Sequence, residues 1–297
     1  MSSFTRSDAF ILWSFVLGNT QSGNASTSRL MKKKEVETMR VIAIMNVKGG
    51  VGKTVTVVNM ATILAGIHGK RVLVVDADGQ GDSSAFFEAD NVQDAGLPNL
   101  IMGLACCYAE VAERTNFEGV DIISGNSELY NIDLEALKRG GNVGIATIAD
   151  LRDAIIEDDA YDVMLVDCPP SFTACSVAAL SAADGVIIPV KLDAFSVRGM
   201  KFLMDQIKQL RRVNGRIKVD GVLVTHWHNV EHVNQAERIL RDKGVPVFQT
   251  HIRRTDKVDE STWACEPLQA YSTYSSAGID YRHFVAEWIK KGGLGNV

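Results

Sequence analysis

From residue 39 to the end of the chain, short apolar runs alternate with longer segments in which apolar positions recur at helical spacing. The short runs are nearly continuous in Val, Ile and Leu, which is typical of parallel strands that helices cover on both faces. They predict strands over residues 40–46, 71–76, 120–124, 163–167, 185–190, 221–225 and 246–250.

Segments of helix length lie between these strands, and the clearest of them predict helices over residues 54–68, 146–156, 197–213 and 231–243. Strands that alternate with helices indicate βαβ units, and therefore an α/β fold with a doubly wound, mostly parallel sheet flanked by helices. Because neither an internal repeat nor a long linker interrupts this pattern, we expect residues 39–297 to form a single domain.

Residues 1–38 differ in character, because they are rich in Ser, Thr and Asn and contain a short basic run near their end. Their apolar run, residues 10–17, has about half of the ~18 residues that a membrane-spanning helix needs. The run resembles the core of a secretion signal, but Asp8 precedes it and no compelling cleavage pattern follows. We therefore expect a disordered N-terminal extension, or a true start at Met31 or Met39.

Composition and charge narrow the class of protein. The 297 residues include 31 Lys and Arg against 36 Asp and Glu, and the net charge of −5 excludes a histone-like coat protein but not a local basic surface. The five cysteines show neither Cys-x-x-Cys nor Cys/His spacing, so neither a zinc site nor a disulfide framework is indicated. We expect a reduced, cytoplasmic protein.

The candidate chemistry begins directly after the first predicted strand, where residues 46–54 read Asn-Val-Lys-Gly-Gly-Val-Gly-Lys-Thr and a helix follows. Such a turn is typical of a phosphate-binding loop, because its backbone N–H groups and the helix N-terminus face phosphate oxygens. Lys53 would reach the β- and γ-phosphates, and Thr54 would bind Mg²⁺. Val47 replaces the usual first glycine, and Lys48 adds a cation. The alternative is a plain connector between strand and helix.

Residues 48–54 resemble the deviant Walker A loop of the ParA/MinD family of ATPases, and the resemblance extends over essentially all of residues 39–297. Further motifs carry it in the family's order: residues 73–82, 166–171, 183–189, 195–199 and 250–254, followed by the spacing of Pro267, Tyr271, Ser275 and Tyr281. The resemblance implies a P-loop fold like that of MinD and the nitrogenase iron protein. It also implies ATP and Mg²⁺ as cofactors.

The same resemblance assigns roles to individual residues. Lys48, Lys53 and Asp78 are the expected catalytic residues, with Asp78 positioning the attacking water. The expected magnesium ligands, direct or through water, are Thr54, Asp76 and Asp167. The expected nucleotide contacts are Lys48, Gly49, Gly50, Val51, Gly52, Lys53, Thr54 and Val55 around the phosphates, and Asn229, Ile252 and Arg254 near the adenine. The alternative for these carboxylates is that they only form turns.

Lys48 is the family's signature lysine, which reaches across a two-fold interface to the nucleotide of the partner protomer. A cation supplied in trans makes hydrolysis depend on dimerisation, as an arginine finger does. The resemblance therefore implies a homodimer that forms on ATP binding. The alternative for Lys48 is an exposed lysine at a strand end.

Three residues depart from the family pattern. Gly79 stands where Pro is usual, Asp82 stands where Asn is usual, and Arg253 replaces the Pro of the usual Ile-Pro-Arg. Two histidines in residues 225–229, a segment expected to border the base, hint at a metal. Because no third ligand accompanies them, we favour a polar loop.

A basic stretch between residues 198 and 218 is the candidate partner surface. It has seven cations against Asp205 alone, and family members bind DNA nonspecifically through basic residues, by phosphate contacts that weaken with salt. The alternative is an ordinary solvated helix face. The cations of this candidate DNA patch are Arg198, Lys201, Lys208, Arg211, Arg212, Arg216 and Lys218.

These observations favour a ParA/Soj-like partition ATPase, cytoplasmic and nucleoid-associated in a prokaryote, that a ParB-like protein stimulates. The first alternative is a MinD-like positioning ATPase. Residues 281–291 could form an amphipathic helix, but the glycine-rich end that follows is unsuited to a membrane anchor, so we expect core packing there and no membrane contact. The second alternative, a cluster-carrying relative, would need paired cysteines such as Cys168 and Cys175. A kinase or ligase on the same scaffold lacks an additional substrate motif.

Overall fold

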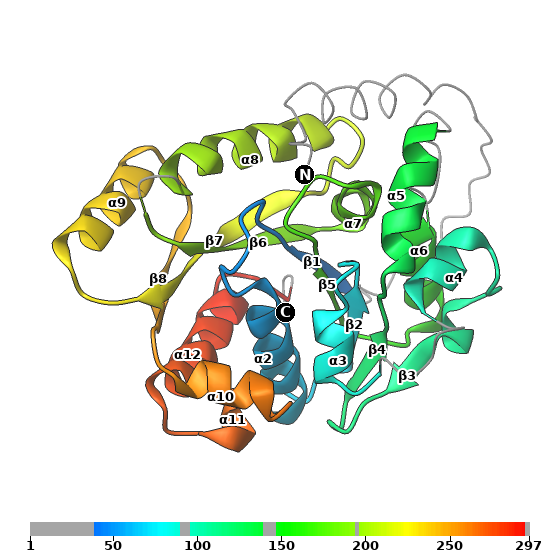
Figure 1. The fold of residues 1–297 in the computed structure, drawn as a ribbon, viewed down its shortest axis with the longest axis horizontal. Helices are drawn as coiled ribbons and strands as arrows, with labels where there is room; N and C mark the ends of the chain where they lie inside the picture. Colours follow the sequence, from blue (N-terminus) through cyan, green and yellow to red (C-terminus); the bar gives the residue numbers. More distant parts are fainter. Residues whose placement is uncertain (1–38, 90–95, 139–146, 194–195, 295–297) are drawn as a thin grey trace, which may run out of the picture.

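The computed structural model describes residues 39–89, 96–138, 147–193 and 196–294. The expected N-terminal extension, residues 1–38, therefore lies outside the described residues. At the centre of the described structure is an eight-stranded sheet (Figure 1). Its bounds are β1 Arg40–Ile44, β2 Val72–Asp76, β3 Ala112–Arg114, β4 Val120–Ile123, β5 Val163–Asp167, β6 Gly185–Lys191, β7 Lys218–Trp227 and β8 Val247–Arg253.

The strand order is β3-β4-β2-β5-β1-β6-β7-β8, and each neighbouring pair is parallel except β3 with β4. The predicted mostly parallel sheet is thus confirmed, and each of the predicted strands is present. The sequence did not predict β3, because Ala-Glu-Arg contains no apolar run. Strand β7 is also longer than predicted at both ends, where Lys218 is exposed and Val219, Asp220, His226 and Trp227 are only partly buried.

Helices cover both faces of the sheet (Figure 1). On one face lie α2 (Lys53–Gly66) and α12 (Ser276–Lys290), and on the other lie α6 (Thr147–Asp158), α7 (Ala174–Ala182), α8 (Ser196–Leu210) and α9 (Glu231–Asp242). The remaining helices are α3 Asp82–Phe86, α4 Leu97–Met102, α5 Glu128–Lys138, α10 Lys257–Trp263 and α11 Leu268–Tyr271, with a 3₁₀ turn at Tyr108–Glu110.

The continuous apolar character of the strands follows from this two-sided cover. Successive side chains of a strand point to opposite faces of the sheet. In β1, Val41 and Ala43 join the hydrophobic core beneath α6 to α9, whereas Ile42 and Ile44 join the core beneath α2 and α12. Both faces of β1 are therefore fully buried, and a strand so placed carries no polar alternation.

The C-terminal helix α12 belongs to the second core. Phe284 and Trp288 are buried, and the Trp288 indole Nε1 donates a hydrogen bond to Asp220 at 2.9 Å. Its N-terminus is capped by Ser275, whose hydroxyl accepts a hydrogen bond from the Gly278 N–H at 3.1 Å. The expectation that residues 281–291 pack in the core is confirmed.

The order of the strands fixes where a ligand can bind. β1 lies between β5 and β6, so the sheet extends in one direction through β5 and β2 and in the other through β6, β7 and β8. Open α/β sheets hold ligands in the crevice outside the carboxyl ends of the strands at such a switch point. The loop that follows β1 stands at this crevice.

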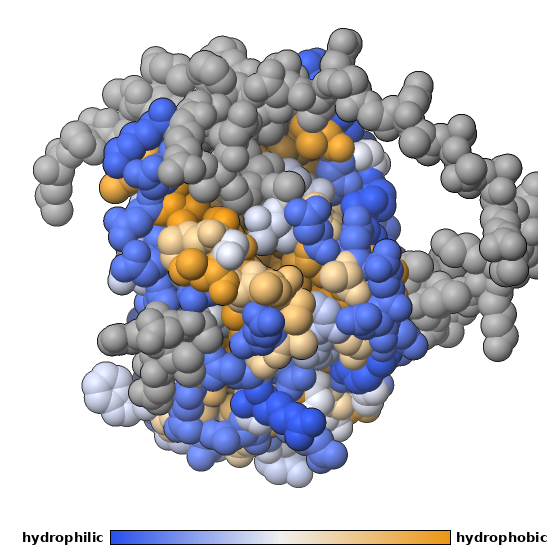
Figure 2. Space-filling view, turned by 90° about the vertical axis from the view of Figure 1, so that its right-hand side faces the viewer, coloured by the Kyte–Doolittle hydropathy of each residue, from blue (hydrophilic) through white to orange (hydrophobic). Residues whose placement is uncertain are grey.

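The surface around α4 and α5 exposes several apolar side chains. Figure 2 looks onto this side of the molecule and shows hydrophobic residues among polar ones. Met102 of α4, Leu104 just after it and Leu134 of α5 are among the exposed large hydrophobic residues here.

No helix within the described residues is long and apolar enough to cross a membrane.

Candidate nucleotide-binding site

The loop between β1 and α2 has the backbone of a phosphate-binding loop. Gly50 (φ +66°) and Gly52 (φ +81°) adopt left-handed conformations, which glycine tolerates without steric cost. Gly52 directly precedes α2, and no side chain caps the helix there. The first N–H groups of α2 are therefore left to a ligand, and the helix dipole makes an anion the favoured one.

Polar side chains from neighbouring strand ends hold this loop in place. The Thr225 hydroxyl, near the end of β7, donates a hydrogen bond to the Val51 carbonyl at 2.8 Å. Asn46 donates its Nδ2 to the Pro189 carbonyl at 2.7 Å and accepts the Lys48 N–H at 3.0 Å. The loop is thus fixed before any ligand arrives, which reduces the entropic cost of binding.

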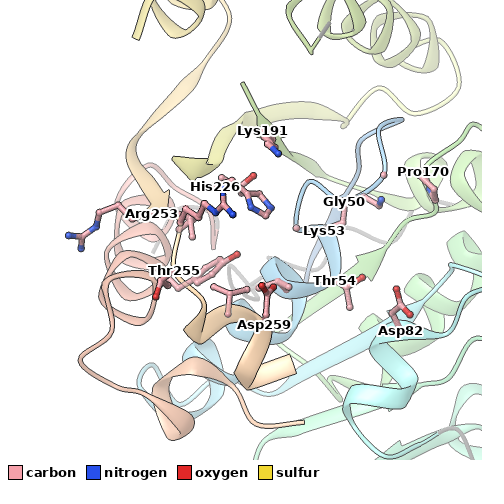
Figure 3. A pocket seen from close by; sticks show the side chains of 18 of the residues that line it. Gly50, Lys53, Thr54, Asp82, Pro170, Lys191, His226, Arg253, Thr255 and Asp259 are labelled. Atoms are coloured by element: carbon pink, nitrogen blue, oxygen red, sulfur yellow. The ribbon is translucent and has the colours of Figure 1, made fainter. Parts of the chain in front are cut away.

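A cavity of about 540 Å³ opens in front of the loop (Figure 3). This volume is typical of sites for small molecules and cofactors. Figure 3 shows Asp82 and Pro170 at one end, Arg253 and Thr255 at the other, and Lys53 between them. The predicted residues that line the cavity are Gly49, Gly50, Gly52, Lys53, Thr54, Val55, Asp78, Ile252 and Arg254.

Three predicted contact residues do not line the cavity. The Val51 side chain is buried, so only its backbone belongs to the loop. Asn229 lies in the turn before α9, where its Oδ1 accepts a hydrogen bond from Asn234 at 2.9 Å, and the structure does not bring it to the cavity. Lys48 forms an ion pair with Asp193, beyond the end of β6.

Three aspartates meet behind and beside the loop. Asp76 and Asp167 end adjacent strands in register, and both are buried. Asp76 Oδ2 accepts two hydrogen bonds from Ser84, from the N–H at 2.9 Å and from the hydroxyl at 2.7 Å. Asp78 lines the cavity itself, and its Oδ1 accepts the Gln80 N–H at 3.1 Å.

This clustering raises the pKa of each carboxyl above its usual value. Burial is the main cause for all three, and for Asp76 the charge of Asp167 adds to it. The Lys53 cation opposes the rise of the pKa at Asp78 and Asp167. Such buried, mutually repelling carboxylates are typical of functional sites, and a cation placed among them would relieve the repulsion.

The residues present fit a magnesium ion that shares its ligands with phosphates and water. Asp167 Oδ2 accepts the Ser83 hydroxyl at 2.7 Å, but the buried Asp167 Oδ1 has no hydrogen-bond partner within the described residues. Within those residues, no group of three or more His, Cys, Asp or Glu could hold a metal ion alone. Mg²⁺ commonly uses one or two carboxylates together with substrate phosphates and water, and hard oxygen donors suit it.

The far end of the cavity explains one departure from the family pattern. The Arg253 guanidinium and N–H both bind the Asp280 carboxylate of α12, with the shortest contact at 2.8 Å. This contact raises the pKa of Arg253 and ties β8 to α12. A proline at this position would lack both the N–H and the guanidinium. Arg253 thus anchors the strand that presents Ile252 and Arg254 to the cavity.

Sequence reasoning did not single out Lys191 or Asp259, which also line the cavity. Lys191 directly follows the apolar run 185–190, and a charged residue at the carboxyl end of a buried strand is a signal that could have found it. Asp259 lies on α10, outside every motif, and no signal in the sequence distinguishes it.

The residues of the candidate DNA patch do not all lie on one helix face. Met200, Leu203, Ile207 and Leu210 bury one side of α8, so Lys201 and Lys208 share the opposite side with Asp205, and Arg212 is exposed in the turn that follows the helix. Arg211, Arg216 and Lys218 are exposed near the end of α8 and the start of β7; Arg211 donates to the Ile217 carbonyl, and Arg216 pairs with Asp184. The side chain of Arg198 is outside the described residues.

A strand–loop–helix motif at a topological switch point, with a lysine, a threonine and buried aspartates around one cavity, defines a P-loop nucleotide-binding protein. The profile of the AAA domain family matches residues 39–219. The chain belongs to this family and is a ParA/MinD-type P-loop ATPase, as the following relatives also support.

One relative is the chromosome partitioning protein ParA of Caulobacter vibrioides, which is 31% identical over 257 residues, 85% of this chain and 95% of its own. Another is a cobyrinic acid a,c-diamide synthase from Mycobacterium smegmatis, solved with an ATP analogue and magnesium; it is 26% identical, with a TM-score of 0.70, over 84% of this chain and 93% of that one. A plasmid partition protein from Borrelia burgdorferi, solved with AMPPNP, shares the fold at 18% identity and a TM-score of 0.72, over 86% of this chain and all of that one.

Proposed function

We propose that this chain is a Mg-ATP-dependent ATPase of the partition branch, which dimerises on ATP and binds DNA without sequence preference. The observation that carries the proposal is the cavity in which Lys53, Thr54 and Asp78 meet at the deviant loop. The partition proteins among the relatives support the same branch. The expected cargo is a plasmid, a chromosome or an integrative element.

In this proposal Lys53 and the first N–H groups of α2 bind the β- and γ-phosphates. Thr54 and Asp167 hold Mg²⁺ directly or through water, and Asp76 supports them from the next strand. The ion supplies charge neutralisation for the phosphates. Asp78 orients a water oxygen, which bonds to the γ-phosphorus as the bond to the bridging oxygen breaks and ADP leaves with that electron pair. The proton of the water passes to an oxygen of the released phosphate.

Lys48 acts on the partner protomer in this proposal. Within its own protomer Lys48 does not line the cavity, although five loop residues beside it do. It is instead held by Asp193, and both side chains are partly exposed at 39% and 36%. A cation of the loop that lies outside its own site is free to serve a second site across a two-fold axis once Asp193 releases it.

The exposed cations of α8 support the DNA-binding part of the proposal. Lys201 and Lys208 form one stripe on α8, Arg212 is exposed in the turn after the helix, and only Asp205 among the stripe's residues opposes their charge. Two such stripes on a dimer would contact phosphates, and their affinity would fall with salt. A DNA-bound, ParB-like protein would stimulate hydrolysis, and the protein would then be cytoplasmic and nucleoid-associated.

Two alternatives are weaker. A cluster-carrying protein would present cysteines at the dimer interface, but Cys168 and Cys175 are both buried in the hydrophobic core. A MinD-like anchor at the C-terminus would need an exposed apolar helix face, yet Phe284, Val285 and Trp288 of α12 are buried. A positioning ATPase with a protein anchor is the remaining alternative, and the following experiment addresses it.

The first experiment measures retention of Asp78→Ala on unrelated DNA duplexes with ATP and with ADP, at low and moderate salt. We expect retention that needs ATP, ignores sequence and weakens with salt. The variant Lys201→Gln/Lys208→Gln should reduce retention and the steepness of its salt dependence, whereas Lys138→Gln/Lys290→Gln removes the same charge elsewhere and should not. Absence of binding in both nucleotide states would point instead to a protein-anchored positioning ATPase.

A further inference from the structure

The turn that presents Asp78 has an unusual neighbour in α5. The ring of Tyr130 lies over Gly79, so that a Cβ placed on Gly79 would approach three ring carbons at 2.7 to 2.9 Å. The phenolic oxygen of Tyr130 also accepts a hydrogen bond from the Gln80 side-chain amide. One aromatic side chain, from a helix about fifty residues further along the chain, thus contacts both residues that follow Asp78.

Gly79 is not required by its own backbone. Its φ lies outside the left-handed region that excludes other residues, unlike that of Gly81 at +69°. A side chain at residue 79 would therefore displace the Tyr130 ring, which is 43% exposed, rather than strain the backbone. The departure from the family's usual proline is explained in the same way, because a proline ring would occupy the space that Tyr130 fills.

Hydrogen bonds within the turn connect Gln80 to the carboxylate of Asp78. The Gln80 N–H donates to Asp78 Oδ1 at 3.1 Å, and the Gly81 N–H donates to the Asp78 carbonyl at 3.0 Å. Fixing Gln80 from its side chain therefore fixes a hydrogen-bond donor to Asp78. Tyr130 itself does not line the nucleotide cavity, so its effect on the reaction is indirect, and this turn is the route that its contacts support.

The start of the turn is held by the strands beneath it: the Ala77 N–H donates to the Asp167 carbonyl at 3.0 Å, and the Asp78 N–H donates to Asp76 Oδ1 at 3.1 Å. A second cavity, of about 220 Å³, lies between residues 77–80 and the segment Pro169–Ser171, and Leu129 and Tyr130 also line it. Contact with such a space contributes no dispersion attraction. On this side of the turn, the Tyr130 ring and hydroxyl contact Gly79 and Gln80.

We propose that Tyr130 is a positioning residue for ATP hydrolysis, which holds Asp78 through Gly79 and Gln80, and that the glycine at position 79 exists to admit its ring. The proposal rests on the proposed role of Asp78. It predicts that Tyr130 and Gly79 are energetically coupled, and that their coupling is expressed in kcat rather than in the KM for ATP.

The test is a double-mutant cycle on steady-state ATP turnover, with Gly79→Ala, Tyr130→Ala and the double variant. We expect Gly79→Ala to lower kcat about tenfold or more in the natural background but less than threefold in the Tyr130→Ala background, where the methyl group has room. Tyr130→Phe keeps the ring and loses only the acceptor for Gln80, and should lower kcat about threefold. In each variant the KM for ATP should stay within about twofold, because Lys53 and the loop are unchanged.

Two controls separate positioning from general damage. Gly215→Ala adds a methyl group where nothing lies within 4 Å, and Tyr274→Phe removes a hydroxyl from a side chain that is 89% exposed. Both should leave turnover unchanged. The proposal would be overturned if Gly79→Ala lowered kcat by the same factor with and without Tyr130, or if the variants changed only the KM for ATP. Asp78→Ala that hydrolyses ATP normally would instead overturn the role of Asp78, so the two failures are distinguishable.

Discussion

At the scale of single residues, the environment of the Asp167 carboxylate is unfavourable in the ligand-free protein and would be relieved by a bound cation. Its Oδ1 is buried without a hydrogen-bond partner among the described residues, and Asp76 faces it from the neighbouring strand. A buried carboxylate with one oxygen left without a hydrogen bond costs stability in the ligand-free protein, although Ser83 and the Lys53 charge partly offset that cost. The arrangement becomes favourable when a cation occupies the site, which is a common pattern at functional sites.

Asp167→Asn should therefore stabilise the nucleotide-free protein while impairing Mg²⁺-dependent turnover. The asparagine oxygen can keep the Ser83 hydrogen bond, and its NH₂ group replaces the orphaned oxygen. We expect the free energy of unfolding at pH 8 to rise by about 1 kcal/mol or more. Urea denaturation without magnesium or nucleotide measures it, and Asp242→Asn, at an exposed carboxylate, is the control.

The same substitution has a pH dependence of known sign. Because burial raises the pKa of Asp167, the folded protein retains a proton that the unfolded chain has already lost. The contribution of this carboxyl to stability therefore falls as the pH rises from about 4 through its raised folded pKa. The advantage of Asp167→Asn should grow from pH 5 to pH 8. An advantage that shrinks over this range would contradict the raised pKa.

At the scale of elements, the cap of α12 helps to stabilise the end of the cavity that Arg253 lines. Ser275 caps α12, and Asp280 in the second turn of that helix binds Arg253 of β8. Ser275→Ala should cost about 1 kcal/mol of stability by removing the cap, whereas Ser275→Asp retains an acceptor and should cost much less. Thermal unfolding checks both. Equal destabilisation by the two variants would show that the cap is not the cause.

The sequence predicted the elements better than the contacts between them. Strands such as 163–167 are buried on both faces and therefore read as unbroken apolar runs, and the loop at 46–54 combines a turn and a motif in one short segment. The three-residue β3 has no such signal, since it is held only by pairing with β4. Elements that are encoded by a local pattern can be predicted from the sequence, whereas contacts between elements depend on the tertiary fold.

The same distinction separates the predicted site residues from the missed ones. Lys53, Thr54 and Asp78 lie in motifs, and the structure brings them to one cavity. Tyr130 and Asp193 act on those motifs from other elements, and nothing in their own neighbourhoods indicates it. Asn229 was placed near the base by its segment alone, whereas the turn before α9 directs it to Asn234.

At the scale of the whole molecule, the pair of Lys48 with Asp193 connects the monomer to the proposed dimer. A lysine that serves the partner's nucleotide must first leave Asp193, so each dimer breaks two such pairs. Partly exposed ion pairs contribute about 0–1 kcal/mol each. Breaking the two pairs therefore lowers the stability of the dimer slightly, and the free energy of ATP binding must offset this cost.

Asp193→Asn should accordingly favour the ATP-bound dimer. In the Asp78→Ala background, which is expected to retain ATP, we expect half-maximal dimerisation at an ATP concentration about two- to tenfold lower than with Asp193 intact, measured by light scattering. Glu231→Gln weakens another exposed pair, with Arg238, and should leave dimerisation unchanged. Lys48→Ala should abolish both dimerisation and turnover, since it removes the cation itself. If Asp193→Asn weakened the dimer instead, Asp193 would belong to the interface and would not restrain Lys48 in the monomer.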